Sequence, residues 1–185
     1  MIAVYVDDLV VSGSHPSTVQ DLKLSFASQF KSTDLGSLSQ ILGIKVTRDF
    51  RNKCFYLSQA SVVKDAIAKF GLDFLPAVRT PMDHTADLTS TPGYVCDLKD
   101  ANRYRSLVRI LAWLSNWTRP KLAFAVHKLQ RVQTNPEPKH FEAAERVFRY
   151  TLRAPSRNGW GLVVTLFFGP TPTLTLARIG SRASR

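Results

Sequence analysis

Residues 3–14, AVYVDDLVVSGS, place two adjacent aspartates, Asp7 and Asp8, between two runs of β-branched and apolar residues. The flanking runs favour extended backbone, and aspartate tolerates the geometry of a tight turn. The stretch therefore predicts a β-hairpin with two carboxylates at its end. Neighbouring carboxylates repel each other unless a cation neutralises them or both face water.

The acidic pair has two interpretations on the dipeptide alone. It is either a solvated turn, since aspartate is a common turn residue, or a site for a divalent cation. Adjacent aspartates offer the hard oxygen ligands that suit Mg²⁺ or Mn²⁺. The second interpretation makes Asp7 and Asp8 half of a two-metal phosphoryl-transfer site.

Beyond the hairpin, the pattern predicts a helix, a second hairpin and another helix. Ser17 with Gln20 matches a capping box ahead of apolar residues at helical spacing. A strand over 41–48, a polar turn and a strand through Leu57 form the second hairpin. The next helix ends at Gly71, which suits a left-handed cap.

The second half of the chain follows a long connecting segment. Residues 72–102 are rich in Pro, Thr and Asp and show no lasting periodicity. Three helical stripes follow, then residues 160–168 suit a strand, and residues after 168 have no clear period. The stripes comprise Tyr104, Leu107, Val108, Leu111 and Leu114, then Leu122, Ala125, Val126 and Leu129, then Phe141, Ala144, Val147 and Phe148.

Charge is unevenly distributed along the 185 residues. Residues 1–100 contain 10 Lys and Arg against 11 Asp and Glu, whereas residues 101–185 contain 15 against 3, a net charge of +12. Phosphate backbones favour such a surface through counterion release, so nucleic acid is the expected partner. A merely solvated basic face is the alternative.

Several classes of protein do not fit the composition. There is no run of eighteen apolar residues, and the N-terminal residues lack the features of a signal peptide, so no membrane partner is expected. The two cysteines and four histidines are scattered rather than spaced as zinc ligands. An intracellular location, in a cytoplasmic particle or the nucleus, is the expectation.

Ordered motifs give the chain a family resemblance. YVDD at residues 5–8 is followed by DLGSLSQILGIKV, YLSQASVVKDAIAKFGL, VRTPMD, YRSLV, TRPKLAFAVHKLQR and NPEPKHFEAAERVFRY. These segments occur in the order seen in copia-type retrotransposon Pol polyproteins, and the likeness covers about residues 2–162. The chain thus resembles a fragment of a copia-type reverse transcriptase, an RNA-directed DNA polymerase.

The resemblance implies an α+β fold, the C-terminal part of a right-hand polymerase palm followed by a helical thumb or connection. It assigns residues 1–71 to the palm, 72–102 to a linker, 103–155 to the basic helices and 156–185 to a degenerate or disordered tail. Asp7 and Asp8 would be the catalytic carboxylates and would bind Mg²⁺ or Mn²⁺. The partners in the intact polyprotein would be an RNA/DNA template-primer duplex and a deoxynucleoside triphosphate.

The resemblance also implies residues that contact template and primer. Tyr5 would line the floor near the nucleic acid, and the hairpin around Gly43 would hold the primer end. Packing explains both residues equally well, Tyr5 as a core aromatic and Gly43 as a strand glycine at a bulge. The basic helices would grip the duplex backbone through Arg105, Arg119, Lys128, Arg131, Arg146 and Arg149, unless these are ordinary solvated side chains.

The chain also departs from the family pattern. The further palm aspartate that completes the metal site has no counterpart, so the isolated chain is expected to lack polymerase activity unless an upstream polymerase fragment supplies it. Arg109 and Lys121 stand where the family has glycine and aspartate. A noncatalytic, basic nucleic-acid-binding module is the alternative function.

Overall fold

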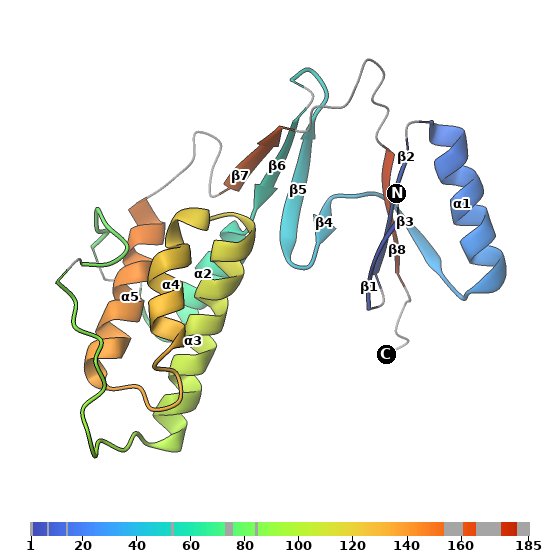
Figure 1. The fold of residues 1–185 in the computed structure, drawn as a ribbon. Helices are drawn as coiled ribbons and strands as arrows, with labels where there is room; N and C mark the ends of the chain where they lie inside the picture. Colours follow the sequence, from blue (N-terminus) through green and yellow to red (C-terminus); the bar gives the residue numbers. More distant parts are fainter. Residues whose placement is uncertain are drawn as a thin grey trace. The chain divides into compact units, whose positions relative to one another are not determined.

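The computed structural model shows a mixed α/β chain that forms two compact units (Figure 1). One unit contains residues 1–55 with 165–185, and the other contains residues 56–164. None of the helices in the described part is long and apolar enough to cross a membrane. The structure describes residues 2–6, 8–13, 15–52, 54–72, 76–83, 85–153, 161–165 and 175–180.

The predicted N-terminal hairpin is confirmed. Strand β1 (Ile2–Tyr5) pairs antiparallel with β2 (Asp8–Gly13), and Tyr5 lies opposite Asp8 where the hairpin closes. Every residue of β1 is exposed, whereas residues 9–12 of β2 are buried. The hairpin therefore reaches the core of its unit through its second strand.

Helix α1 (Pro16–Gln29) covers the hairpin, as the apolar spacing predicts. Its Val19 is buried against Leu9 and Val11, with further apolar side chains packed around them. The predicted capping box is wrong, because His15 is the N-cap residue and no side chain caps the helix. Pro16 starts the helix instead, since proline has the helical φ and no N–H that needs a partner.

The first sheet contains a strand that the sequence analysis did not predict. Its order is β1, β2, β8 (Thr175–Gly180) and β3 (Thr33–Ser37), so β8 lies between β2 and β3 and runs antiparallel to both. The tail over 156–185, expected to be degenerate or disordered, thus contains strands at 161–165 and 175–180. Pairing with the N–H and C=O groups of distant strands explains it, and local periodicity does not reveal such pairing.

The second sheet has the order β4 (Gln40–Ile41), β5 (Ile44–Asp49), β6 (Cys54–Ser58) and β7 (Gly161–Thr165). The predicted hairpin of β5 and β6 is confirmed, with Asp49 accepting hydrogen bonds from the N–H groups of Arg51 and Asn52 at 3.0 Å. The single strand predicted over 41–48 is wrong, because residues 42 and 43 form a turn between β4 and β5.

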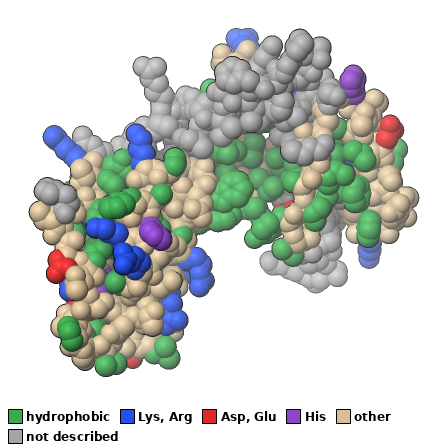
Figure 2. Space-filling model, in the orientation of Figure 1, with side chains coloured by type: hydrophobic (Ala, Val, Ile, Leu, Met, Phe, Trp, Pro, Cys, Tyr) green, Lys and Arg blue, Asp and Glu red, His purple; other side chains and the backbone are tan. Residues whose placement is uncertain are grey.

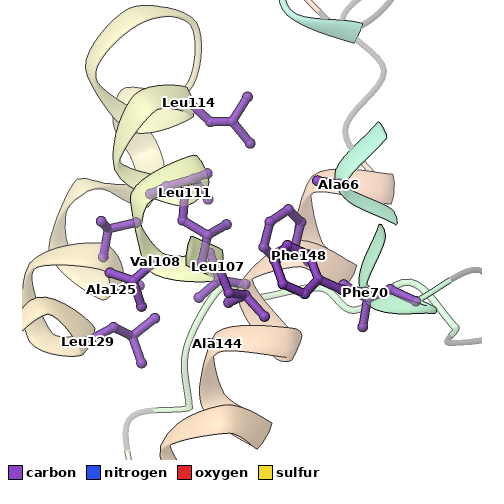
Figure 3. Close-up of a cluster of buried hydrophobic side chains, with 14 of the residues drawn as sticks. Ala66, Phe70, Leu107, Val108, Leu111, Leu114, Ala125, Leu129, Ala144 and Phe148 are labelled. Atoms are coloured by element: carbon purple, nitrogen blue, oxygen red, sulfur yellow. The ribbon is translucent and has the colours of Figure 1, made fainter. Parts of the chain in front are cut away.

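Helices form the core of the second unit. After α2 (Ala60–Phe70) come α3 (Leu98–Trp117), the short 3₁₀ helix η1 (Pro120–Leu122), α4 (Ala123–Gln130) and α5 (Pro138–Arg153). The three predicted stripes are confirmed, since their side chains point toward one another in the core (Figure 3). Gly71 ends α2 with φ 68°, in the predicted left-handed conformation.

Helix α2 belongs to this helical unit, although the sequence analysis grouped it with the N-terminal hairpins. Its buried face comprises Val63, Ala66 and Phe70, and the Phe70 ring lies 6.3 Å from that of Phe148 on α5. Burial of this apolar face is favourable, so α2 packs against α3 and α5 although the hairpins are nearer to it in sequence. The compact units therefore divide the chain at residue 55 rather than 71.

The linker predicted over 72–102 contains no helix or strand in the described part of 76–97, but residues 98–102 belong to α3, so the linker ends earlier than predicted. It is nevertheless bound to the start of α5. Thr91 donates hydrogen bonds from its N–H and hydroxyl to the Glu137 carboxylate at 2.6 and 2.8 Å, and these bonds lower the pKa of Glu137. We call residues 76–97 the connecting segment.

His140 links the connecting segment to the same helix end. Its Nδ1 accepts the Glu137 N–H at 2.9 Å, so Nε2 carries the proton that reaches the Leu88 carbonyl at 3.1 Å. The ring is fully buried, and burial lowers the pKa of His140. The neutral imidazole therefore fits both of its hydrogen-bond partners.

Candidate functional site

The end of the N-terminal hairpin is the first candidate site. Tyr5 and Asp8 are opposite residues in an antiparallel pair, so their side chains lie on the same face of the hairpin. Tyr5 is 56% exposed, so it is not a core aromatic. Asp8 is partly exposed, and Asp7 lies outside the described residues.

Val6 shows that the hairpin end is strained. Its φ is 49°, in the left-handed region, and its side chain is 82% exposed. A β-branched residue in that region costs on the order of 1–3 kcal/mol, and such strain is concentrated at functional sites. Exposure of the side chain means that core packing does not offset the cost.

The described residues do not complete a metal site at this hairpin. Within them, no group of three or more His, Cys, Asp or Glu side chains is arranged to hold a metal ion. Asp8 offers one carboxylate with the chemistry that Mg²⁺ and Mn²⁺ prefer. The carboxylate of Asp8 therefore suits a divalent ion, but the described residues supply too few ligands to surround one.

Gly43 lies in the tight turn that connects β4 and β5. Ile41 pairs with Ile44, which leaves Leu42 and Gly43 as a two-residue turn with φ values of 50° and 73°. Two-residue turns with positive φ at both positions match the twist of paired strands, and glycine adopts that conformation without a steric penalty. Gly43 is thus a turn glycine rather than a strand glycine at a bulge.

The six predicted basic contacts have different partners in the structure. Arg146 donates a hydrogen bond to the Thr80 hydroxyl at 3.0 Å and lies 4.0 Å from the Asp83 carboxylate. Arg149 donates to the Pro76 carbonyl at 2.8 Å. These two arginines of α5 therefore hold the connecting segment.

Two further arginines bond within the helical framework. The Arg119 guanidinium donates to the Thr151 carbonyl of α5 at 3.1 Å, and burial lowers its pKa. Arg105 donates to the Ala101 carbonyl at 3.2 Å, one turn earlier on α3. Both side chains are partly buried.

Lys128 and Arg131 lie instead on the outer face of α4, where the sequence analysis missed three neighbours. Arg131 is exposed and Lys128 is partly exposed. Basic, histidine and hydrophobic side chains lie close together where α4 faces the viewer (Figure 2). The three missed residues are exposed and alternate with the buried stripe of α4; they are Lys121, Phe124 and His127.

Comparisons with known proteins show which proteins the chain is similar to. Residues 1–84 match the model of the reverse transcriptase (RNA-dependent DNA polymerase) family. A transposon Ty5-1 protein of Saccharomyces cerevisiae is 29% identical over 171 residues, which cover 90% of this chain and 54% of the yeast protein.

Plant relatives are similar over nearly the same part of the chain. Retrovirus-related Pol polyproteins from transposon TNT 1-94 of Nicotiana tabacum and transposon RE1 of Arabidopsis thaliana are each 29% identical, over 81% and 83% of this chain. The chain spans only 12% and 10% of their lengths. No solved structure matches the chain. The resemblance indicated by the motifs is confirmed: the chain is a relative of the reverse transcriptases of copia-type retrotransposon Pol polyproteins.

Proposed function

We propose that residues 2–13 form the catalytic hairpin of an RNA-directed DNA polymerase that copies RNA into DNA during transposition. The observation that supports this most is the position of Asp8, opposite the exposed Tyr5 at the strained end of a hairpin. That hairpin falls within the residues that match the reverse transcriptase family.

In this proposal Asp7 and Asp8 supply carboxylate oxygens to divalent metal ions. Such ions, when bound, help activate a primer 3′-hydroxyl and neutralise charge on the incoming triphosphate. Asp8 orients its carboxylate on the Tyr5 face of the hairpin, and Tyr5 lines the floor beneath the primer. The Gly43 turn holds the primer end.

Metal binding at the hairpin is testable by luminescence. Tb³⁺ prefers carboxylate oxygens and emits when a nearby tyrosine absorbs, so Tyr5 should sensitise an ion held by Asp7 and Asp8. We expect Mg²⁺ or Mn²⁺ to displace Tb³⁺ competitively. Asp7→Asn with Asp8→Asn should abolish the emission, and Tyr5→Phe should reduce the emission while leaving Tb³⁺ bound.

The matched control for metal binding is Asp21→Asn, which removes an exposed carboxylate from α1 and should leave the emission unchanged. Emission that persists in the double Asn variant would contradict the assignment of Asp7 and Asp8.

We further propose that this chain alone does not polymerise, because two carboxylates leave the metal site incomplete. Primer extension with Mg²⁺ or Mn²⁺ should give no product. Adding an upstream palm polypeptide from a related polyprotein should restore synthesis that depends on Asp7 and Asp8. Template-dependent synthesis by the purified chain alone would refute this expectation.

A noncatalytic nucleic-acid-binding module is the second candidate function, favoured by the outward Lys128 and Arg131 on α4. Backbone contacts make affinity fall steeply with salt, with a slope of about 0.9 per phosphate contact for duplex DNA. Fluorescence anisotropy against salt concentration measures this slope. Absence of binding even at low salt would exclude the module.

A further inference from the structure

The outer surface of α4 carries a regular stripe of side chains. From η1 to the C-cap of α4, the spacings of three, four and three residues place the side chains on one helical face. The opposite face is buried in the core through Leu122, Ala125, Val126 and Leu129. We call the outward side chains the α4 stripe; they are Lys121, Phe124, Lys128 and Arg131.

Phe124 is the unusual member of the α4 stripe. Its side chain is 70% exposed, so most of the ring makes no packing contact. The Lys128 ammonium lies 5.1 Å from the ring centre, within the range of a cation–π interaction. The stripe thus presents an accessible aromatic ring among three cationic side chains.

A groove continues from the end of the α4 stripe. It has a volume of about 480 Å³ and lies between the C-terminal end of α4 and residues 86–90 of the connecting segment, with Lys128, Arg131 and Val132 in its wall. Asp87 also lines it, and Thr89 lowers the pKa of that carboxylate by hydrogen bonding. The groove therefore presents two cationic side chains and one carboxylate.

We propose that the α4 stripe binds a single nucleic-acid strand, with one unpaired base stacked on Phe124 and the neighbouring phosphates on Lys121, Lys128 and Arg131. This inference rests on the proposed nucleic-acid binding and names its substrate form.

The exposed Phe124 ring favours a single strand over a duplex as the ligand of the α4 stripe. In a duplex both faces of each base are covered by neighbouring pairs, so an aromatic ring adds nothing to a grip on the backbone. Unpaired bases offer a free face, and stacking on an aromatic ring strengthens binding by roughly 5- to 150-fold per base. Cationic side chains alone would bind the phosphates of either a single strand or a duplex.

Phe50 provides a matched comparison elsewhere in the chain. Its ring is 74% exposed, and the Arg48 guanidinium lies 4.5 Å from its centre, so it has the same exposure and the same type of cation contact. Asp49, the last residue of β5, precedes it, and Phe50 lies in a turn rather than on a helical stripe of cations. Binding that requires the α4 stripe should therefore not require Phe50.

The test measures anisotropy of a labelled short oligothymidylate and of a labelled blunt-ended duplex without a loop, with the full chain at equal salt. Phe124→Leu keeps an apolar side chain at an exposed site and should leave the fold intact, which circular dichroism checks. We expect it to weaken oligothymidylate binding roughly 5- to 150-fold and to leave duplex binding unchanged. Phe124→Trp should restore binding, and Phe50→Leu should have no effect.

Two outcomes would overturn the inference while leaving the proposed function standing. Either Phe124→Leu leaves oligothymidylate binding unchanged, or it weakens oligothymidylate and duplex binding equally. Failure of the wild-type chain to bind either nucleic acid at low salt would overturn both the inference and the nucleic-acid-binding proposal.

Discussion

The N-terminal hairpin and the helical unit differ in how much of their apolar surface is buried. On β1, Val4 is 71% and Tyr5 56% exposed, whereas Leu111, Leu114 and Phe148 in the helical unit are fully buried. The helical unit therefore has a core of its own. The hairpin end is held mainly by strand pairing and keeps its side chains accessible.

The largest expected effect breaks the helical core. Phe148→Ala removes a buried ring that packs on Phe70 and should lower the free energy of unfolding by about 3–5 kcal/mol. Urea unfolding followed by tryptophan fluorescence measures it, because all three tryptophans lie outside residues 1–55. Val4→Ala on β1 is the contrasting variant. Its unfolding is followed by far-ultraviolet circular dichroism, because no tryptophan lies in residues 1–55, and its stability should change by less than about 0.5 kcal/mol. Equal effects would contradict the comparison.

The next largest expected effect is a pH dependence of stability. It comes from His140 and Glu137, which bind the connecting segment to α5. The folded-state pKa of His140 is lowered from 6.5, so its stabilising contribution is present above that value and is lost as pH falls through the folded pKa. Glu137, with its pKa lowered from 4.5, loses its contribution in a more acidic range. Thermal unfolding of the helical unit should therefore begin to shift below about pH 6.5.

His140→Asn is the control for that pH dependence, since its amide oxygen can accept the Glu137 N–H without titrating. The variant should lose the shift just below pH 6.5 and keep the more acidic one. A wild-type melting temperature that stays constant down to pH 5 would refute the role of His140.

A smaller effect, an increase in stability, is expected at the hairpin end. Val6→Gly relieves the positive φ and should stabilise the hairpin by about 1 kcal/mol, after the added freedom of the unfolded chain is discounted. Hydrogen exchange of the β1 and β2 amides measures the gain. Faster exchange in the variant would show that Val6 is not strained.

The smallest effect separates the structural arginines from the outward cations. Arg149→Gln removes the hydrogen bond to Pro76 and should cost less than about 1 kcal/mol, with little change in nucleic-acid affinity. Lys128→Gln with Arg131→Gln should leave stability unchanged and flatten the salt dependence of binding. Similar binding losses in both variants would mean that α5 also contacts nucleic acid.

Local patterns predicted much of the fold. The three helical stripes and the hairpins were visible because buried side chains repeat at the period of their own element. The insertion of β8 between β2 and β3 was not visible in the sequence, since strand pairing over long sequence distances leaves no local period. The Leu42–Gly43 turn was missed because the flanking apolar residues continue the strand pattern.

The candidate site was predicted less completely than the fold. Basic composition identified Arg146 and Arg149, but their partners are a hydroxyl and a backbone carbonyl of the connecting segment, which carry no sequence signal. Arg109 and Lys121, which depart from the family pattern, are both exposed, so no helix packs closely over either position. Phe124 was detectable in principle, as an aromatic residue outside the buried stripe of its helix.

Strand β1 is the first strand in its sheet order, so within the described residues only one of its edges is hydrogen-bonded. An open edge with apolar side chains exposed is a template for association with another extended chain. At high concentration the protein should therefore aggregate through this edge. Replacing Val4 with lysine should improve its solubility without disturbing the buried face of β2.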